Sequence, residues 1–338
     1  MTTARSTRLV PSASGRYTRL FGPWRHRASS VSNMKPRIAV GPQTTAWVDE
    51  AVRKGGGEIV AANEHPDGLV WIEFRAPRNL LNFLSAHPDI GWVQLPLAGV
   101  EDLFAAGVID RERRWTSAKG AYAEPVAEHA LTLALAGLRH LPTRIRARTW
   151  GSPAGTSLYD QPVTVIGAGG IAVALLKLLE PFRAKVTVVR QQPEPLKGAT
   201  RTLGIDQLHE ALHGALVVVL APALTPQTLH LIGQSELDAM RRDAWLVNVG
   251  RGPLIDTNAL VDTLRADGIA GAALDVTDPE PLPTGHALWG LKNCLITPHT
   301  ADTTEMIWPL LGARITENVR RLAAGEELVG VVDPDKGY

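Results

Sequence analysis

The chain has 338 residues, 45% of them hydrophobic and 20% charged, which is typical of a globular protein with room for two domains. No apolar run approaches the roughly 20 residues that span a bilayer, so we expect no membrane partner. Residues 1–33 hold six arginines and no acidic residue, so removing these six charges from the net charge of +1 leaves −5 on the remainder. This balance argues against nucleic acid as a partner of the folded body.

Residues 1–33 are rich in Arg, Ser and Thr and have no sustained apolar period. Two interpretations stay open for this leader: a targeting segment, or an unstructured extension before a start at Met34. The single cysteine, Cys294, excludes an intrachain disulfide, and no Cys/His cluster has the spacing of zinc ligands. We expect a cytoplasmic protein without a metal site.

From Met34 onward, short β-branched runs alternate with helical patterns. The sequence predicts a helix over 45–56 that ends at the glycines 55–57, and a second helix over 77–88. Strands are expected at 37–40, 58–62, 68–72 and 90–95. These elements predict a small α/β domain that ends near residue 123.

Residues 124–150 form one long helical pattern, too apolar for a helix that faces solvent, so we expect it to pack between domains or subunits. His129 is interpreted as a helix histidine at such a contact. A last helix is expected over 303–327, ending at Gly325. Between these helices, strands are predicted at 163–166, 185–189, 215–220, 244–249, 271–276 and 294–297. Helices separate these strands, including one capped by Asp256, which indicates a parallel sheet with right-handed crossovers.

A glycine loop follows the strand at 163–166. Gly167, Gly169 and Ala172 fit the pattern G-x-G-x-x-G/A at the start of a helix. The first glycine permits a tight turn, the second lets a pyrophosphate approach the backbone, and the small third residue lets helix and strand pack closely. Free N–H groups at the helix start, such as those of Gly170 and Ile171, would bind the phosphates.

Arg190 ends the next predicted strand, 23 residues after Gly167. An acidic residue there would bind the adenosine ribose and repel a 2′-phosphate. The guanidinium of Arg190 can instead bind a 2′-phosphate, and the side chain of Gln191 adds a neutral hydrogen-bond donor. We therefore favour NADP(H) over NAD(H) as the cofactor; the alternative is a solvated surface arginine with no effect on the choice.

Three further segments, 248–256, 274–283 and 296–301, follow predicted strands, and parallel sheets place ligand sites at these strand ends. They supply Arg251, Glu280 and His299. A histidine is suited to proton transfer near neutral pH, a carboxylate can orient its ring, and an arginine can bind a carboxylate and stabilise a developing alkoxide.

The ordered motifs NVGRG, LDVTDPEPLP and TPH resemble those of the D-isomer-specific 2-hydroxyacid dehydrogenase family, and the resemblance runs from about Met34 to Tyr338. It implies an α/β protein in which a doubly wound Rossmann domain, residues 124–302, is inserted in a smaller flavodoxin-like substrate domain. Residues 34–123 and 303–338 would form that substrate domain.

The resemblance also assigns roles. Arg251 would bind the substrate, Glu280 and His299 would form the acid–base pair, and Asp275 would lie near the nicotinamide carboxamide. Backbone amides of Leu97, Ala98, Gly99 and Val100 would meet the substrate carboxylate. The residues expected around the dinucleotide are Gly167, Gly169, Gly170, Ile171, Arg190, Gln191, Pro222, Thr228, Val249, Gly250 and Asp275.

The sequence thus predicts an oxidoreductase that transfers a hydride between NAD(P)H and a small 2-oxo acid, with glyoxylate or hydroxypyruvate reductase as the nearest activity class and a homodimer as the expected assembly. D-3-phosphoglycerate dehydrogenase is an alternative, for which Arg75 and Arg78 are the nearby candidates to bind a distal phosphate. A dinucleotide-sensing protein without catalysis is the second alternative.

Overall fold

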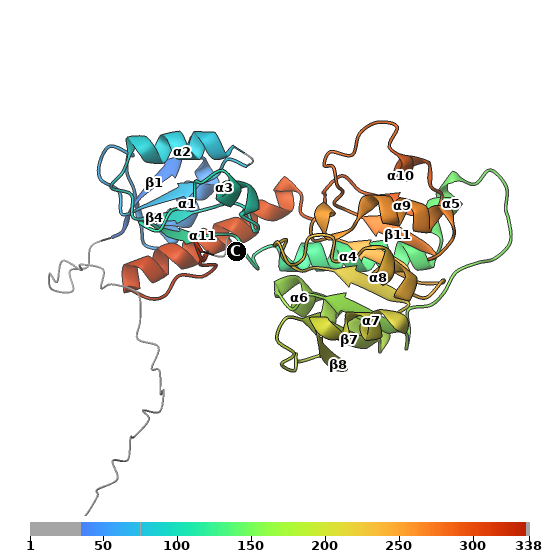
Figure 1. The fold of residues 1–338 in the computed structure, drawn as a ribbon. Helices are drawn as coiled ribbons and strands as arrows, with labels where there is room; N and C mark the ends of the chain where they lie inside the picture. Colours follow the sequence, from blue (N-terminus) through green and yellow to red (C-terminus); the bar gives the residue numbers. More distant parts are fainter. Residues whose placement is uncertain (1–34, 75, 336–338) are drawn as a thin grey trace, which may run out of the picture. The chain divides into compact units, whose positions relative to one another are not determined.

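The computed structural model describes residues 35–74 and 76–335, which contain two parallel β-sheets (Figure 1). The predicted leader, 1–33, lies outside the described residues, as does Arg75. Among the helices of the described part, none combines the length and the apolar character that crossing a membrane requires.

The first sheet has five strands in the order β2-β1-β3-β4-β5, and every neighbouring pair is parallel. This is the flavodoxin-like order. Its strands are β1 (Arg37–Gly41), β2 (Glu58–Ile59), β3 (Gly68–Trp71), β4 (Trp92–Gln94) and β5 (Arg114–Thr116). The strand expected at 58–62 therefore has only two residues, and β5 was not predicted.

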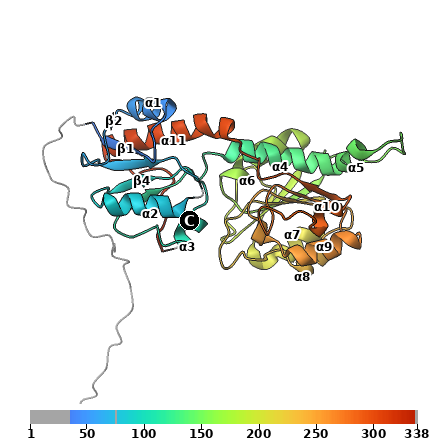
Figure 2. The same ribbon diagram turned by 90° about the horizontal axis from the view of Figure 1, so that it is seen from above.

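Four helices accompany this sheet: α1 (Ala46–Lys54), α2 (Pro77–Ala86), α3 (Glu101–Ala105) and, from the other end of the chain, α11 (Thr304–Ala324). α11 runs beside α1 (Figure 2), and the Thr316 hydroxyl donates to the carbonyl of Ala51 at 3.0 Å. The fully buried Asn318 donates to Gln94 Oε1 of β4 at 2.7 Å. These contacts support our proposal that residues 303–338 complete the domain begun by 34–123.

The second sheet has seven parallel strands in the order β12-β11-β10-β9-β6-β7-β8. Numbered from β6, this is the doubly wound Rossmann order with one added strand. The order of the strands along the sheet reverses at β6, since β7 lies on one side of β6 and β9 on the other. The strands are β6 (Pro162–Ile166), β7 (Lys185–Arg190), β8 (Arg201–Gly204), β9 (Val217–Leu220), β10 (Trp245–Asn248), β11 (Gly271–Leu274) and β12 (Cys294–Ile296). The predicted fold class is confirmed.

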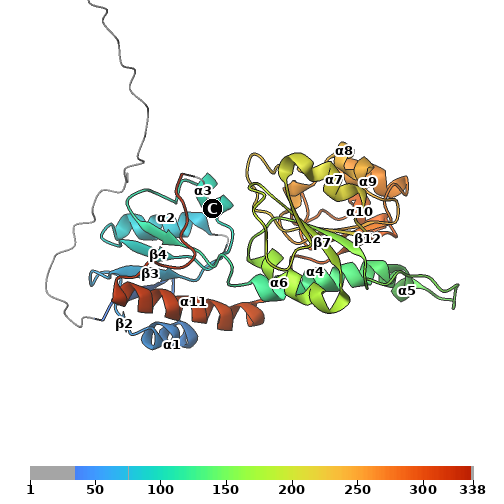
Figure 3. The same ribbon diagram turned by 90° about the horizontal axis from the view of Figure 1, so that it is seen from below.

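Helices cover both faces of this sheet (Figure 3). Side chains alternate along each strand, so Val217 and Val219 of β9 face the cluster that includes α4 and α6, whereas Val218 and Leu220 face the opposite cluster. The first face carries α4 (Ala123–Leu138) and α6 (Gly170–Leu179); the second carries α7 (Leu208–His213), α8 (Gln234–Ala239), α9 (Thr257–Arg265) and α10 (Ala287–Gly290). Short 3-10 turns lie at Glu180–Phe182, Ile205–Gln207 and Gly252–Leu254. The predicted cap of α9 is present, because Asp256 accepts from the amides of Asn258 and Ala259.

The helical pattern at 124–150 is interrupted, and this corrects the prediction of one long helix. α4 ends at Leu138, and the separate α5 (Leu141–Arg146) follows His140, whose φ is 52°. Pro142 has no N–H to offer the carbonyl of Leu138 four residues earlier, and that carbonyl accepts from Thr156 at 2.8 Å instead. The proline therefore explains the break.

Candidate active site

The glycine loop lies where the sheet order switches. Gly167 follows β6 with φ of 105°, and a Cβ there would lie 2.7 Å from the Ala221 carbonyl oxygen, so no other residue fits. Beside Gly169, by contrast, a Cβ would meet no atom of the described residues within 4 Å. α6 starts at Gly170, and the fully buried Ala172 packs this helix on the sheet. The open space next to Gly169 and the N-terminus of a ten-residue helix fit a dinucleotide's pyrophosphate.

Arg190 ends β7, as predicted. Its Nη1 donates a long bond, 3.4 Å, to the carbonyl oxygen of Glu194. The side chain is half-buried and the neighbouring Gln191 is exposed. A guanidinium therefore stands where a carboxylate would select against a 2′-phosphate.

The loops after β9 and β10 adjoin the glycine loop. A Cβ on Gly250 would lie 3.3 Å from the carbonyl oxygen of Pro222, so the two loops are in contact, and Val249 is buried. The hydroxyl of Thr228 donates to the carbonyl of Ala223 at 2.8 Å and accepts from the Thr225 amide. In this structure Thr228 orders its own loop.

Arg251 extends from the loop after β10 toward the first sheet's loop at 97–101. Its Nη1 donates to the Gly250 carbonyl at 2.8 Å, and its Nε lies 3.6 Å from Glu101 Oε1. A Cβ on Gly99 would overlap the guanidinium of Arg251 and the carboxylate of Glu101. A side chain at position 99 would therefore make both of these side chains move.

The remaining residues of the loop 97–100 differ in exposure. Ala98 is exposed, Leu97 is half-buried, and Val100 is 2% exposed because its side chain belongs to the core of the first sheet. Only the backbone of Val100 is thus available to a ligand. Arg78, a candidate for binding a distal phosphate, is exposed in α2.

Glu280 and His299 are paired. Nδ1 of His299 lies 2.7 Å from Glu280 Oε1, and both side chains are about one-third exposed. Glu280 belongs to the loop after β11, whose Asp278 carbonyl accepts from the Thr257 hydroxyl at 2.8 Å. A carboxylate only accepts, so Nδ1 carries a proton, and Nε2 is the ring nitrogen on the other side from Glu280.

His299 is held in a left-handed conformation, with φ of 52°, by residues around it. The carboxylate of Asp275, 2% exposed at the end of β11, accepts from the Thr297 hydroxyl at 2.6 Å and from the amides of Thr300 and Ala301 at 2.9 and 3.1 Å. The Asp275 carbonyl accepts from the His299 amide at 2.8 Å. The predicted ligand of the nicotinamide thus also fixes the loop of the histidine.

Two residues of this site were not predicted from the sequence. The fully buried Asn248 accepts from the Gly250 amide at 3.0 Å and donates to the Arg251 carbonyl at 2.9 Å, so it shapes the loop of the arginine. It begins the motif NVGRG, and that was the available signal. Asp302 follows His299 by three residues; burial raises the pKa of Asp302, the charge of Asp275 adds to this rise, and the charges of His299 and Arg251 oppose it.

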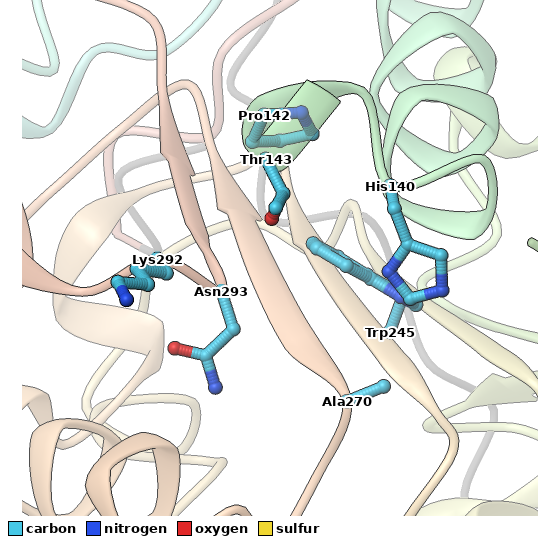
Figure 4. A pocket seen from close by; sticks show the side chains of 7 residues that line it. All are labelled: His140, Pro142, Thr143, Trp245, Ala270, Lys292 and Asn293. Atoms are coloured by element: carbon cyan, nitrogen blue, oxygen red, sulfur yellow. The ribbon is translucent and has the colours of Figure 1, made fainter. Parts of the chain in front are cut away.

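A separate cavity of about 80 Å³ lies at the other end of the strands (Figure 4). Its lining includes Trp245, which begins β10, and Asn293, which precedes β12, together with His140 after α4. The glycine loop, Arg251, Glu280 and His299 all follow the carboxyl ends of strands. The cavity therefore takes no part in the candidate site.

Comparison with known proteins identifies the family. Residues 129–301 match the model of the D-isomer specific 2-hydroxyacid dehydrogenase, NAD binding domain. The chain belongs to the D-isomer specific 2-hydroxyacid dehydrogenase family, as the motifs predicted, and it is an NAD(P)-dependent oxidoreductase that acts on 2-hydroxy acids or their 2-oxo counterparts.

Similar proteins extend the match over most of the chain. A Corynebacterium melassecola protein from the proB 3′ region is 40% identical over 295 residues, which cover 85% of this chain and 95% of that one. A glyoxylate reductase of Thermofilum pendens is 33% identical over 231 residues, 65% of this chain and 68% of that one. The crystal structure of a D-isomer specific 2-hydroxyacid dehydrogenase from Xanthobacter autotrophicus Py2, in complex with NADPH and MES, aligns with a TM-score of 0.76 at 28% identity, over 90% of this chain and all of that one.

Proposed function

We propose that the protein is an NADP(H)-preferring reductase of small 2-oxo acids, of the glyoxylate or hydroxypyruvate reductase class. The observation that carries this proposal is the 2.7 Å contact between His299 and Glu280, on the same sheet edge as the loop of Arg251. A sensor without catalysis would have no need of this ordered pair. The similarity to a glyoxylate reductase supports the substrate class.

The residues of this edge perform complementary tasks in the proposed reaction. When bound, the reduced nicotinamide supplies the hydride that C2 of the 2-oxo acid accepts. Negative charge then grows on the carbonyl oxygen, and His299 donates the Nε2 proton to it, giving a 2-hydroxy acid. Glu280 holds the ring by Nδ1 throughout, and its charge stabilises the imidazolium before transfer.

Arg251 binds and orients the substrate in this proposal. Its planar guanidinium can pair with the substrate carboxylate and stabilise the developing alkoxide. The amides of the loop 97–100, which Gly99 brings against Arg251, would complete the carboxylate site. Displacement of the Glu101 carboxylate from Arg251 would accompany substrate binding.

The preference for NADP(H) rests on Arg190. The guanidinium at the end of β7 can bind a 2′-phosphate bidentately, and no acidic side chain occupies positions 190–193 to repel it. The similar structure from Xanthobacter autotrophicus Py2 is a complex with NADPH, which is in keeping with this choice.

Steady-state kinetics on a panel of 2-oxo acids, each with NADPH and NADH, test the proposal. We expect turnover of glyoxylate or hydroxypyruvate with NADPH and a lower kcat/KM with bulkier substrates. Turnover of 3-phosphohydroxypyruvate in preference to both would favour the phosphoglycerate dehydrogenase alternative. Tight NADPH binding without turnover of any of these acids would favour the sensor.

We also propose that two copies of the chain associate through α5 and the segment after it. The exposed fractions of Ile145 and Trp150 are 77% and 98%, although both side chains are apolar, and Leu141 is 44% exposed. Apolar surface of this kind is typical of a protein interface. A homodimer is also the expectation from family precedent.

A further inference from the structure

His129 contacts Asp275 and Thr297, which hold the His299 loop. It lies on α4, between Ala127 and Ala130, which are fully buried and fix the helix on its neighbours. Its Nε2 lies 3.1 Å from the Thr297 hydroxyl and 3.3 Å from Asp275 Oδ1. The ring therefore connects a rigid helix to the residues that hold the catalytic loop.

The hydrogen-bond network assigns the proton on His129. Thr297 has one hydroxyl proton, and its 2.6 Å contact with Asp275 uses that proton. The Thr297 oxygen can then only accept from His129, so Nε2 carries a proton in both the neutral and the charged ring. His129 is a donor to Thr297 and to Asp275 alike.

Donors to Asp275 keep its carboxylate charged in a buried place. Burial alone would raise the pKa of Asp275, but the bonds from His129, Thr297 and the amides of Thr300 and Ala301 together hold that pKa below its ordinary value. A protonated Asp275 would lose acceptor capacity for the loop amides. The loop around His299 thus depends on this charge.

The other ionisable groups around this carboxylate lie on neighbouring loops. Asp302 and His299 come from the loop after β12, and Arg251 comes from the loop after β10. The charge of Asp275 adds to the rise in the pKa of Asp302 that burial causes. Within the described residues, His129 is the side-chain donor to Asp275 that comes from a helix.

We propose that His129 is a positioning residue for the reaction, which acts through Asp275 and Thr297 on the loop that presents His299. The inference rests on the proposed function, because positioning matters only if His299 transfers a proton. One part of the inference does not depend on the substrate. A donor at position 129 keeps the amides of Thr300 and Ala301 bonded to Asp275. A purely structural histidine would affect stability alone.

Two substitutions separate these roles. His129→Gln keeps a donor, because the Nε2 of glutamine is the same number of bonds from the backbone as that of histidine. His129→Leu keeps an apolar volume and removes the donor. His213→Leu is the matched control, since His213 is exposed on α7.

Three measurements are made on the full-length variants. Amide hydrogen exchange at Thr300 and Ala301 reports the loop without any turnover. The pH profile of kcat reports the acid limb, and fluorescence titration reports NADPH affinity.

For His129→Leu we expect exchange of both amides to rise about tenfold, which corresponds to loss of one buried hydrogen bond worth about 1.4 kcal/mol. We expect kcat to fall about tenfold and its acid limb to move up by about one pH unit, because the pKa of Asp275 rises when a donor is lost. The Kd for NADPH should stay within about twofold. His129→Gln should restore most of the exchange protection and the kcat, and His213→Leu should resemble the wild type.

Unchanged exchange and an unchanged acid limb in His129→Leu would overturn the inference, as would a His129→Gln variant impaired to the same extent. If the wild type reduces no 2-oxo acid, the proposed function fails while the exchange data still decide whether His129 holds the loop. If His129→Leu does not fold, Thr297→Val and Thr297→Ser make the same comparison, because only serine keeps the bridging hydroxyl.

Discussion

Nδ1 of His299 contacts Oε1 of Glu280 at 2.7 Å, although the two residues come from loops after different strands. β11 and β12 are parallel neighbours, so the loops at their carboxyl ends meet at one edge of the sheet. The contact engages Nδ1, so in the proposed reaction Nε2 is the nitrogen that transfers the proton. It is the geometry that a proton donor with an orienting carboxylate requires.

Removing the imidazole should abolish proton transfer and spare cofactor binding. We expect His299→Ala to lower kcat about 10³-fold, within the range of general acid–base catalysis, with a Kd for NADPH within about twofold of wild type. Stopped-flow turnover and fluorescence titration measure the two quantities. Retention of wild-type turnover would remove His299 from the mechanism.

Glu280→Gln keeps the size of the side chain and removes its charge. We expect kcat to fall about tenfold to a hundredfold, because the amide stabilises the imidazolium less and orients the ring less firmly. The matched control is Glu305→Gln in the first turn of α11, an exposed acidic residue. An equal kcat for Glu280→Gln and wild type would contradict the assigned role.

Arg251 should act mainly on the substrate. Loss of a charge-assisted pair with a carboxylate costs about 1.5–3 kcal/mol, so Arg251→Ala should lower kcat/KM for the 2-oxo acid by about 10- to 100-fold. Arg251→Lys should keep only part of the wild-type kcat/KM, since an ammonium lacks the planar pair of donors of a guanidinium. Arg265→Ala, an exposed arginine of α9, serves as control. The hypothesis fails if Arg251→Ala changes only the affinity for NADPH.

The sequence predicted these candidate catalytic residues because each follows an apolar run that indicates a strand. Once the strands are parallel, their carboxyl ends share an edge, and Arg251, Glu280 and His299 are expected near one another without knowledge of any distance. The glycine loop was predictable because it also follows a strand, and because the turn at Gly167 has a backbone conformation that only glycine adopts without strain.

Contacts between distant side chains were not predictable. β8 (Arg201–Gly204) is a strand because it pairs with β7. Its own four residues have no alternation of apolar and polar side chains that would predict a strand. His129 was interpreted as a residue at a domain or subunit contact, yet it reaches Thr297, 168 residues away, and nothing local in α4 indicates that partner. The break before α5 did have a signal in Pro142, which the apolar density of the segment obscured.

Arg190 should determine the choice of dinucleotide. Arg190→Asp places a carboxylate at the end of β7, where it would repel a 2′-phosphate and accept from ribose hydroxyls, so the ratio of kcat/KM for NADPH over NADH should fall by at least about 100-fold. Lys185→Asp changes charge equally at the other end of the same strand and should leave the ratio unchanged. If Arg190→Asp still prefers NADPH, the 2′-phosphate contact lies elsewhere.

Cys294 should be inert in the native protein. It is 3% exposed in β12, and burial raises the pKa of its thiol to about 12, so only about one molecule in ten thousand is a thiolate at pH 8. A thiol-specific disulfide reagent should therefore react at the rate of unfolding, and in guanidinium it should release one equivalent per chain. Rapid stoichiometric reaction of the native protein at pH 8 would show that the strand is open to solvent.

The exposed apolar residues after α4 should determine the oligomeric state. Trp150 is 98% exposed and Ile145 is 77% exposed. Burial of each side chain against a partner would contribute about 1.5–3 kcal/mol to the free energy of association. Trp150→Asp combined with Ile145→Asp should therefore convert a dimer to a monomer in light scattering at micromolar concentration, with the melting temperature of the chain nearly kept. Ile205→Asp, another exposed apolar position, is the control and should leave the mass unchanged. If the wild type has the mass of one chain at these concentrations, the proposed interface is wrong, because the monomer then keeps these apolar side chains exposed to solvent.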